Sequence, residues 1–407
     1  MQNKPGKSKV AVAVKMLVAA IAMGSVVGAA SAAAPDHTRV IVKFKPGHGA
    51  SMKSAVAAAK GNVKLEIFGM DAMAVEVPLT ALKGLQNNPN VEYVEEDHKR
   101  YPFALSSPST GTPYALGQSV PYGIKQVQAD QLPDTNSGNR RICIIDSGID
   151  RAHEDLTGNA VNMTGQYDSG TGNWYTDENS HGTHVAGTIA AVNNSGVGVV
   201  GVNSNRRIKL HIVKVFGASG WAYSSDLSSA ANQCASAGSN VISMSLGGPT
   251  YNATENSTFS NLASRGILNI AAAGNAGNTS ISYPAGYSAV MMVGAIDEFK
   301  QWATFSQYNS KVEITGPGVA VMSTVPLAVK GVKYANFNGT SMSTPHVAGV
   351  AALVWSYFPT CTGNQIRTSL TKSAQDLGPV GRDTKFGFGL VQARTAYDRI
   401  RTYGCGV

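Results

Sequence analysis

The sequence predicts an α/β fold in which a parallel sheet is covered by helices on both faces, preceded by a small α+β domain. Its 407 residues are 43% hydrophobic and 14% charged, as in large globular proteins. Beyond residue 118, five apolar runs alternate with helical patterns. Each run is apolar throughout, as expected for parallel strands that are buried on both faces. Before residue 98, another compact set of strand and helix patterns indicates a separate domain.

The first 34 residues predict a secretory signal peptide. Four lysines precede an apolar run at residues 16–27, and small residues that permit cleavage after Ala32 or Ala34 follow it. The run is too short to span a bilayer well, and no other stretch approaches about 18 continuous apolar residues. We therefore expect a secreted, extracellular protein without a membrane anchor.

Residues 38–97 predict the small domain element by element. "TRVIVKFKPG" predicts a strand that ends at a Pro-Gly turn, and "ASMKSAVAAAKG" predicts a helix closed by Gly61. Two strands in "VKLEIFGMDAMAVEVP", a helix over residues 79–86 and a strand in "VEYVEED" follow. This order is typical of a ferredoxin-like unit. The next segment, "LSSPSTGTP", has the composition of an exposed linker.

The strands of the larger domain are predicted from runs that end in Gly, Asp or Ser. They are "RRICIIDSG", "RIKLHIVKVFG", "NVISMSLGG", "GILNIAAAGN" and "AVMMVGAID". Helical patterns lie near residues 181–191, 225–237 and 255–265. In parallel sheets, ligands bind outside the carboxyl ends of the strands, so the polar residues that close these runs are the functional candidates.

The formal net charge of +8 does not indicate a nucleic-acid partner. From Ser106 onward Lys and Arg number 20 and Asp and Glu number 17, so most of the excess lies before that residue. No basic stripe remains that could follow a phosphate backbone.

Three residues could together perform nucleophilic catalysis: Asp146, His181 and Ser341. A serine hydroxyl needs an imidazole to take its proton, and a carboxylate fixes the tautomer of that imidazole. Taken singly, each has an ordinary explanation: Asp146 as a turn residue, His181 as a polar residue at a helix start, and Ser341 as a helix cap.

Five blocks of sequence connect the three candidates. "DSGID", "HGTHVAG", "SMSLGG", "AAAGN" and "NGTSMSTPHVAG" resemble, in this order, the signature blocks of the subtilisin-like serine peptidases, the subtilase family. The resemblance covers residues 118–399, and residues 38–103 resemble the inhibitor-type propeptide of secreted members. It implies a signal peptide at 1–34, a propeptide and folding chaperone at 35–105, and a peptidase domain at 106–407.

The resemblance also implies a role for each candidate. Ser341 would be the nucleophile, His181 the general base and then acid, and Asp146 the residue that orients His181. Asn275 would donate its side-chain amide to the oxyanion, together with the backbone N–H of Ser341. We expect Ser341 at the start of a helix, with Pro345 in the first turn of that helix.

Substrate binding is implied along two extended segments between which a peptide inserts as an added strand. Because such pairing recognises backbone groups that every peptide has, broad specificity is expected. We also expect a preference for a large apolar side chain on the residue before the cleaved bond. Protein and peptide substrates and the chain's own propeptide are the expected partners of a monomer. The implied substrate-binding residues are Ser219, Gly220, Trp221, Ser245, Leu246, Gly247, Gly248, Ala273, Gly274, Ser282, Gly339 and Thr340.

A Ca²⁺ site is implied by the same resemblance. Side-chain oxygens would come from Gln118, Asp155 and Asn194, and main-chain oxygens from Val192 and Gly198. Oxygen ligands on a flexible loop suit Ca²⁺ rather than Zn²⁺. The loop "NNSGVGVVG" is one residue longer than in close family members, and a solvated glycine loop without metal is the alternative.

The four cysteines favour disulfides, since an exported chain with an even number and no CxxC motif fits neither metal nor redox chemistry. Three pairings are open. The implied fold makes Cys143 and Cys234 neighbours, and a bridge between Cys361 and Cys405 would fasten the C-terminus.

The leading function is therefore a secreted serine endopeptidase of broad specificity, made as a preproenzyme, which forms an acyl-enzyme on Ser341. Residues 100–105 would block its cleft until they are cut. One alternative is a catalytically silent binding protein on the same fold. The other is a dedicated processing protease with strict specificity, which we expect to carry acidic residues in its pockets.

Overall fold

The computed structural model describes residues 37–103, 118–167, 170–194 and 196–407. The predicted signal peptide and the whole predicted linker, residues 105–113, lie outside these residues. Within the described ranges, no helix is both long and apolar enough to cross a membrane.

The N-terminal domain has the predicted order of strands and helices. Its strands are β1 (His37–Phe44), β2 (Asn62–Glu66), β3 (Ala72–Pro78) and β4 (Val91–Glu96), in the antiparallel order β2-β3-β1-β4. Alternate residues of β1, Val40, Val42 and Phe44, pack with the helices α1 (Gly49–Ala58) and α2 (Leu82–Gln86). The two helices thus cover one face of the sheet, as expected for a ferredoxin-like unit, and a smaller buried cluster of Ile41, Ile67 and Ala72 lies apart from them.

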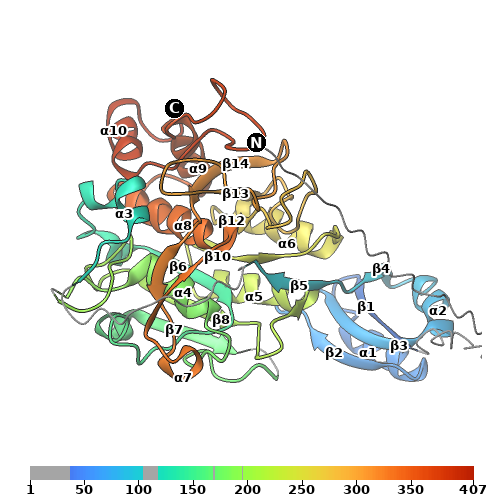
Figure 1. Ribbon diagram of the computed structural model, residues 1–407. Coiled ribbons are helices and arrows are strands. Elements are labelled where there is room, and N and C mark those ends of the chain that lie inside the picture. The colour runs from blue at the N-terminus through green and yellow to red at the C-terminus, as the bar shows by residue number, and fades with distance from the viewer. Residues whose placement is uncertain (1–36, 104–117, 168–169, 195) are drawn as a thin grey trace, which may run out of the picture. The chain divides into compact units, whose positions relative to one another are not determined.

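The larger domain is built on a seven-stranded parallel sheet with the order β14-β13-β12-β10-β6-β8-β7 (Figure 1). The five predicted strands form its centre: β6 (Arg141–Asp146), β8 (Lys209–Lys214), β10 (Val241–Met244), β12 (Leu268–Ala272) and β13 (Val290–Ile296). The sequence prediction lacked the two edge strands, β7 (Met163–Tyr167) and β14 (Val312–Pro317). Both mix polar residues into the strand, so neither forms a continuous apolar run.

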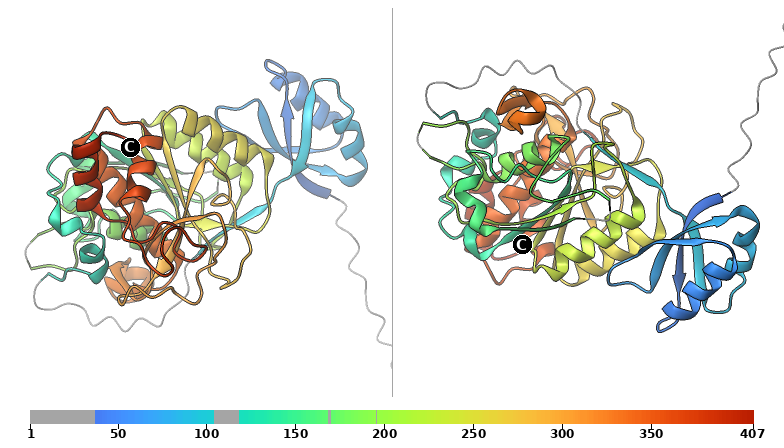
Figure 2. Two further views of the ribbon diagram at one scale, coloured as in Figure 1. Left: turned by 90° about the horizontal axis from the view of Figure 1, so that it is seen from above. Right: turned by 90° about the horizontal axis from the view of Figure 1, so that it is seen from below.

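Helices cover both faces of this sheet, as predicted (Figures 1 and 2). On one face, Ile142 and Ile144 of β6 pack in a cluster with α4 (His181–Ala190) and α8 (Thr340–Tyr357). On the other face, Cys143 and Ile145 pack with α5 (Ser224–Ser236) and α6 (Ala253–Ser264).

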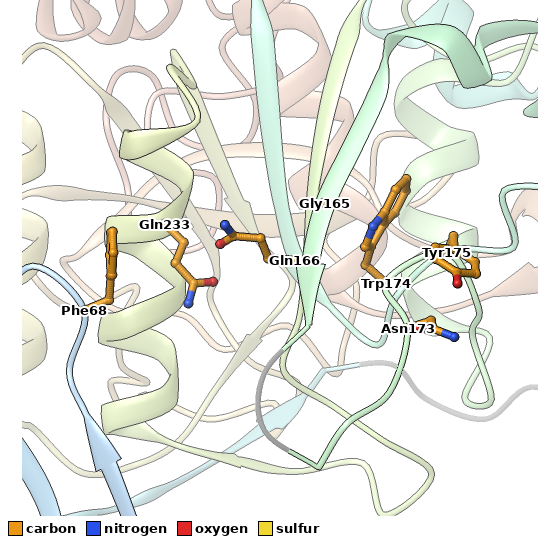
Figure 3. Close-up of a pocket in the computed structure, with 7 residues that line it drawn as sticks. All are labelled: Phe68, Gly165, Gln166, Asn173, Trp174, Tyr175 and Gln233. Atoms are coloured by element: carbon orange, nitrogen blue, oxygen red, sulfur yellow. The ribbon is translucent and has the colours of Figure 1, made fainter.

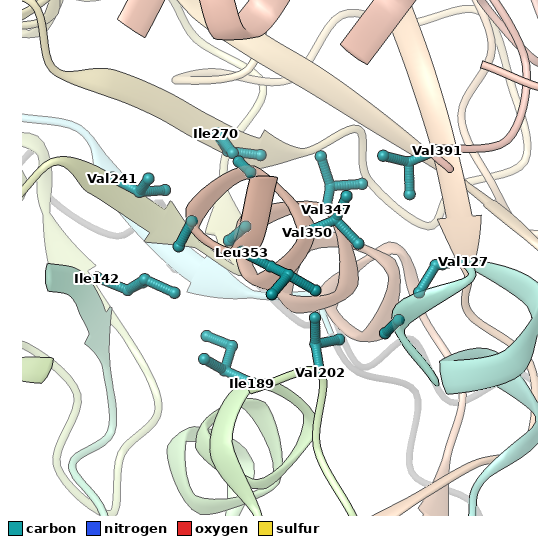
Figure 4. Close-up of a cluster of buried hydrophobic side chains, with 14 of the residues drawn as sticks. Val127, Ile142, Ile189, Val202, Val241, Ile270, Val347, Val350, Leu353 and Val391 are labelled. Atoms are coloured by element: carbon teal, nitrogen blue, oxygen red, sulfur yellow. The ribbon is translucent and has the colours of Figure 1, made fainter. Parts of the chain in front are cut away.

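Helix α8 passes through the centre of the larger cluster (Figure 4). Every residue from Thr340 to Ser356 is buried, and from Val347 to Trp355 the helix is apolar on all sides, as expected for a helix in a core. Gly349 is needed there, because a Cβ atom at this position would lie 2.8 Å from the side chain of Val202. The core therefore holds the N-terminus of α8 at the carboxyl edge of the sheet.

Two disulfides fasten the fold. One joins Cys143 of β6 to Cys234 of α5, with Cα atoms 5.6 Å apart. The other joins Cys361 to Cys405, with Cα atoms 5.7 Å apart, and ties the segment after α10 (Ala393–Tyr403) to the chain beyond α8. Of the three pairings open from the sequence, the structure has this one.

Candidate active site

The first two catalytic candidates lie at the carboxyl end of the sheet. Asp146 ends β6, and His181 begins α4. His181 Nδ1 is 2.8 and 2.9 Å from the two carboxylate oxygens of Asp146, and both side chains are buried. Such a carboxylate holds the imidazole hydrogen on Nδ1 and leaves Nε2 to act as a base. Among the described residues, His181 Nε2 has no hydrogen-bond partner.

A second buried carboxylate, Asp177, shapes the turn that delivers His181. It accepts hydrogen bonds from Ser147 Oγ at 2.9 Å, Ser180 N at 2.8 Å and Thr183 N at 2.9 Å. Burial raises the pKa of Asp177, and these hydrogen bonds oppose the shift. The sequence interpretation overlooked Asp177, although an acidic residue shortly before a helix is a known signal of a helix start.

Ser341, the second residue of α8, donates its hydroxyl hydrogen to the carbonyl oxygen of Ser245 at 2.9 Å. Ser245 follows β10, the neighbour of β6, so Ser341 is held at the same carboxyl edge of the sheet at which Asp146 lies.

The prediction that Pro345 lies in the first turn of its helix was wrong. Helix α8 begins at Thr340, so Pro345 is its sixth residue. A proline there removes the N–H that would bond the carbonyl oxygen of Ser341, four residues earlier. Ser245 Oγ donates to that carbonyl oxygen instead, at 2.8 Å. The two serines therefore bind each other, and these bonds join the segment after β10 to the start of α8.

Asn275 is oriented by Thr340. Its Oδ1 accepts hydrogen bonds from Thr340 N and Thr340 Oγ1, each at 2.9 Å. Its Nδ2 is thereby turned the other way and donates to the carbonyl oxygen of Phe103 at 2.6 Å. A fixed amide donor on a carbonyl oxygen is the arrangement that stabilises a developing oxyanion.

The end of the N-terminal domain forms a strand in the predicted substrate cleft. Strand β5 (Lys99–Pro102) lies between β9 (Ala222–Tyr223) and β11 (Leu246–Gly247) and is antiparallel to both. The N–H of Phe103 continues this pairing with the carbonyl oxygen of Ser245 at 3.1 Å. Inserting a strand between two edges satisfies backbone groups on both of its sides.

One wall of this cleft differs from the expectation by a few residues. Ala222 and Tyr223 pair with β5, whereas the sequence indicated residues 219–221. Trp221 contributes its ring instead, since Lys99 Nζ lies 4.1 Å from the ring centroid. On the opposite wall, Leu246 and Gly247 pair as predicted.

The Phe103 ring lies against Gly247. A Cβ atom on Gly247 would be 2.6 Å from the ring, so a glycine is required for the ring to enter. Nearby, Ser282 Oγ is 3.3 Å from Gln307 Oε1, and a Cβ atom on Gly274 would be only 1.9 Å from that oxygen. The sequence analysis did not include Gln307 among the candidate residues, because it lies in no recognisable motif. Gly247, Gly274, Ser282 and Gln307 are all uncharged.

Comparisons with known proteins agree with this geometry. The family model described as "Subtilase family" (Peptidase_S8) matches residues 138–389. The chain belongs to the subtilase family. The model of the fervidolysin N-terminal prodomain matches residues 25–97, so this subtilase carries a prodomain. It is accordingly a serine endopeptidase.

Individual relatives cover most of the chain. Subtilisin NAT of Bacillus subtilis subsp. natto is 38% identical over 353 residues, which is 85% of this chain and 86% of that protein. Alkaline elastase YaB of Bacillus sp. (strain YaB) is 40% identical over 328 residues, covering 80% and 79%. The crystal structure of the psychrophilic subtilisin-like protease Apa1 from the Antarctic psychrotroph Pseudoalteromonas sp. AS-11 matches with a TM-score of 0.67 and 34% identity. That match covers 71% of this chain and 100% of Apa1.

Two carboxylates of the subtilase's prodomain cap helices of its peptidase domain. Asp97 accepts hydrogen bonds from Ser225 N at 2.9 Å and Ser225 Oγ at 2.6 Å, in the first turn of α5. Glu95 accepts from Ala253 N and Thr254 N, each at 2.8 Å, at the start of α6. Helix N-termini present free N–H groups and positive potential, so both carboxylates bind favourably.

The residues proposed as Ca²⁺ ligands in this subtilase come together in space. Gln118 Nε2 is 2.7 Å from the carbonyl oxygen of Val192 and 3.4 Å from Asn194 Oδ1. Asn194 Nδ2 in turn donates to Asp155 Oδ1 at 2.9 Å. Burial raises the pKa of the Asp155 carboxyl to about 6, so a cation beside it would offset an unfavourable desolvation.

The loop after Asn194 presents a different carbonyl from the one expected. The carbonyl oxygen of Gly198 accepts a hydrogen bond from Ser119 N at 2.7 Å. The carbonyl oxygen of Val199 faces Gln118 instead, with Nε2 at 3.1 Å. One carboxylate with amide and carbonyl oxygens remains a donor set that suits Ca²⁺.

A pocket of about 470 Å³ lies elsewhere on the subtilase (Figure 3). It shares no residue with the catalytic or substrate-binding candidates, whose cleft is filled by β5. Its lining consists of Phe68, Gly165, Gln166, Asn173, Trp174, Tyr175 and Gln233.

Proposed function

We propose that this subtilase is a secreted endopeptidase of broad specificity that first cuts its own chain after Phe103. The observation that carries the proposal is the hydrogen bond from Asn275 Nδ2 to the carbonyl oxygen of Phe103. A donor on this oxygen would stabilise an oxyanion formed there, which supports cleavage of the bond between Phe103 and Ala104. The proposed propeptide therefore ends at residue 103 rather than 105.

The chemistry follows from the groups in place. Ser341 Oγ attacks the carbonyl carbon of Phe103 while His181 Nε2 takes the hydroxyl proton. Charge develops on the carbonyl oxygen, where Asn275 Nδ2 and the N–H of Ser341 stabilise it. His181 then gives the proton to the amine of Ala104 as the C–N bond breaks. Water, deprotonated by His181, hydrolyses the resulting ester and frees Ser341.

Broad specificity is supported by the backbone pairing of β5 with its two neighbouring strands. Its pairing with β9 and β11 uses backbone groups, which every extended peptide offers. The ring of Phe103, the residue before the proposed cleavage point, lies against Gly247, and the nearby Ser282 and Gln307 are uncharged. Secretion is supported by the signal-peptide pattern of the first 34 residues.

A Ca²⁺ ion bound by Asp155, Asn194, Gln118 and the carbonyl oxygens of Val192 and Val199 would serve stability. When bound, the ion would neutralise the buried carboxylate and join the loop to the start of the peptidase domain. It would take no part in the reaction.

The test compares wild type with Ser341→Ala and with the control Ser310→Ala, which changes an exposed serine. Wild type and control should hydrolyse casein, release a propeptide that ends at Phe103, and take a fluorophosphonate label on Ser341. The Ser341→Ala protein should remain an unlabelled full-length proenzyme. A folded wild type that neither cleaves nor labels would favour the binding-protein alternative.

A further inference from the structure

Arg100 belongs to the prodomain, yet its side chain is completely buried in the peptidase domain. Its guanidinium meets Glu255 of α6 in a two-pronged ion pair. The distance from Nε to Glu255 Oε1 is 2.9 Å, and from Nη2 to Oε2 it is 2.8 Å. Glu255 is likewise completely buried. Paired planar groups of this kind are the strongest hydrogen-bonded ion pairs in proteins.

The surroundings of the pair form a built pocket. Arg100 Nη2 also donates to the carbonyl oxygen of Thr250 at 3.0 Å. Tyr287 donates its hydroxyl hydrogen to Glu255 Oε2 at 2.7 Å. Gly248 leaves room for the guanidinium, since a Cβ atom there would lie 3.2 Å from Arg100 Nη1. Apart from Arg100 itself, all these groups belong to the peptidase domain, so the pocket stays when the prodomain leaves.

Arg100 holds a defined position in the cleft. It lies three residues before Phe103, which makes it the fourth residue before the proposed cleavage point. Arg100 is completely buried whereas the next residue, Tyr101, is 45% exposed, so successive side chains of the strand point in opposite directions and that of Arg100 points into the peptidase domain. The pairing of Arg100 with Ala222 and of Tyr101 with Gly247 fixes this register.

We propose that Glu255 forms an acidic subsite that selects arginine at the fourth position before the cleaved bond of protein substrates. The proposal rests on the proposed function and deepens it, because main-chain pairing admits many sequences and this subsite ranks them. An apolar side chain entering the pocket would leave the Glu255 carboxylate buried without a cation. Lysine offers a single charged group that cannot match both carboxylate oxygens, so it should rank below arginine.

The test uses the mature enzyme and peptides that share Tyr-Pro-Phe before the cleaved bond and differ in the preceding residue: Arg, Lys, Leu or Glu. Wild type should cleave the Arg peptide with a kcat/KM about 30-fold or more above that of the Leu peptide, since buried charge pairs differ by at least this factor. Glu255→Gln should lose most of this preference while it still cleaves the Leu peptide. The control Glu298→Gln, at an exposed site, should behave as wild type.

A second variant guards against failed maturation. Glu255→Leu, expressed together with Arg100→Leu in the prodomain, replaces the ion pair by two apolar side chains and should prefer the Leu peptide. Equal cleavage of Arg and Leu peptides by wild type, or an unchanged preference in Glu255→Gln, would overturn the subsite. If wild type cleaves none of the peptides, the proposed endopeptidase function fails instead.

Discussion

Asp97 offers a quantitative test of how the prodomain binds its peptidase domain. Its carboxylate is fully buried and accepts four hydrogen bonds: from Arg39 Nε at 2.8 Å, from Ser224 Oγ at 3.0 Å, and from the N–H and hydroxyl of Ser225. Three of these donors, on Ser224 and Ser225, belong to the peptidase domain, and leaving such buried groups without their charged partner costs about 3 kcal/mol in total. Asp97→Ala should therefore weaken binding of the prodomain about 100-fold.

The assay measures the inhibition constant of residues 37–103, added as a separate chain to the mature enzyme. Glu95→Ala, which loses hydrogen bonds to two backbone N–H groups of α6, should weaken inhibition by about tenfold, as expected for a lost helix cap. The exposed Glu92 on the same strand serves as the control. If Asp97→Ala inhibits within threefold of wild type, helix capping does not hold the prodomain.

Three further predictions concern catalysis and stability. Asn275→Ala should lower kcat by about 100- to 1,000-fold, a figure measured on subtilisin itself, with KM nearly unchanged in steady-state assays. Burial lowers the pKa of His346 from 6.5 to about 4, so the unfolded chain binds more protons below pH 6.5. The free energy of unfolding should thus decrease by ~3 kcal/mol as the pH falls from 6.5 to 4. His346→Gln should show a smaller decrease, measured as a smaller change of Tm over the same pH range. EDTA should lower the Tm of the mature enzyme, and Asp155→Asn should abolish the response; an unchanged wild-type Tm would contradict the Ca²⁺ proposal.

The sequence predicts the centre of the fold better than its edges. Strands β6, β8, β10, β12 and β13 are continuously apolar because both of their faces are buried, and such runs are visible in the sequence. The edge strands β7 and β14 contain polar residues, so the sequence shows no continuous apolar run at either of them. Similarly, the position of Pro345 depends on the residue at which α8 begins, and helix boundaries are the least certain feature of any sequence pattern.

For the site, motif spacing indicated the residues that we propose to carry the chemistry but not those that support them. Asp146, His181, Asn275 and Ser341 each lie in a recognisable block. Glu255 lies in a predicted helix with no motif, and its role depends on which side chain of β5 turns toward it. Which side chain faces Glu255 depends on the register between strands that are distant in the sequence, and sequence periodicity does not predict this register.

The proposed substrate cleft between β9 and β11 also limits which segments of a protein substrate can be cleaved. A segment must give up its own helical or sheet hydrogen bonds over the five positions corresponding to residues 99–103 before it fits between two strands. For a folded target, the cleavage rate is then scaled by the equilibrium of local opening at that segment. The sites at which the enzyme cleaves a folded protein should therefore show where that protein unfolds locally. An arginine at the fourth position before the cleaved bond would affect the choice only among segments that have already opened.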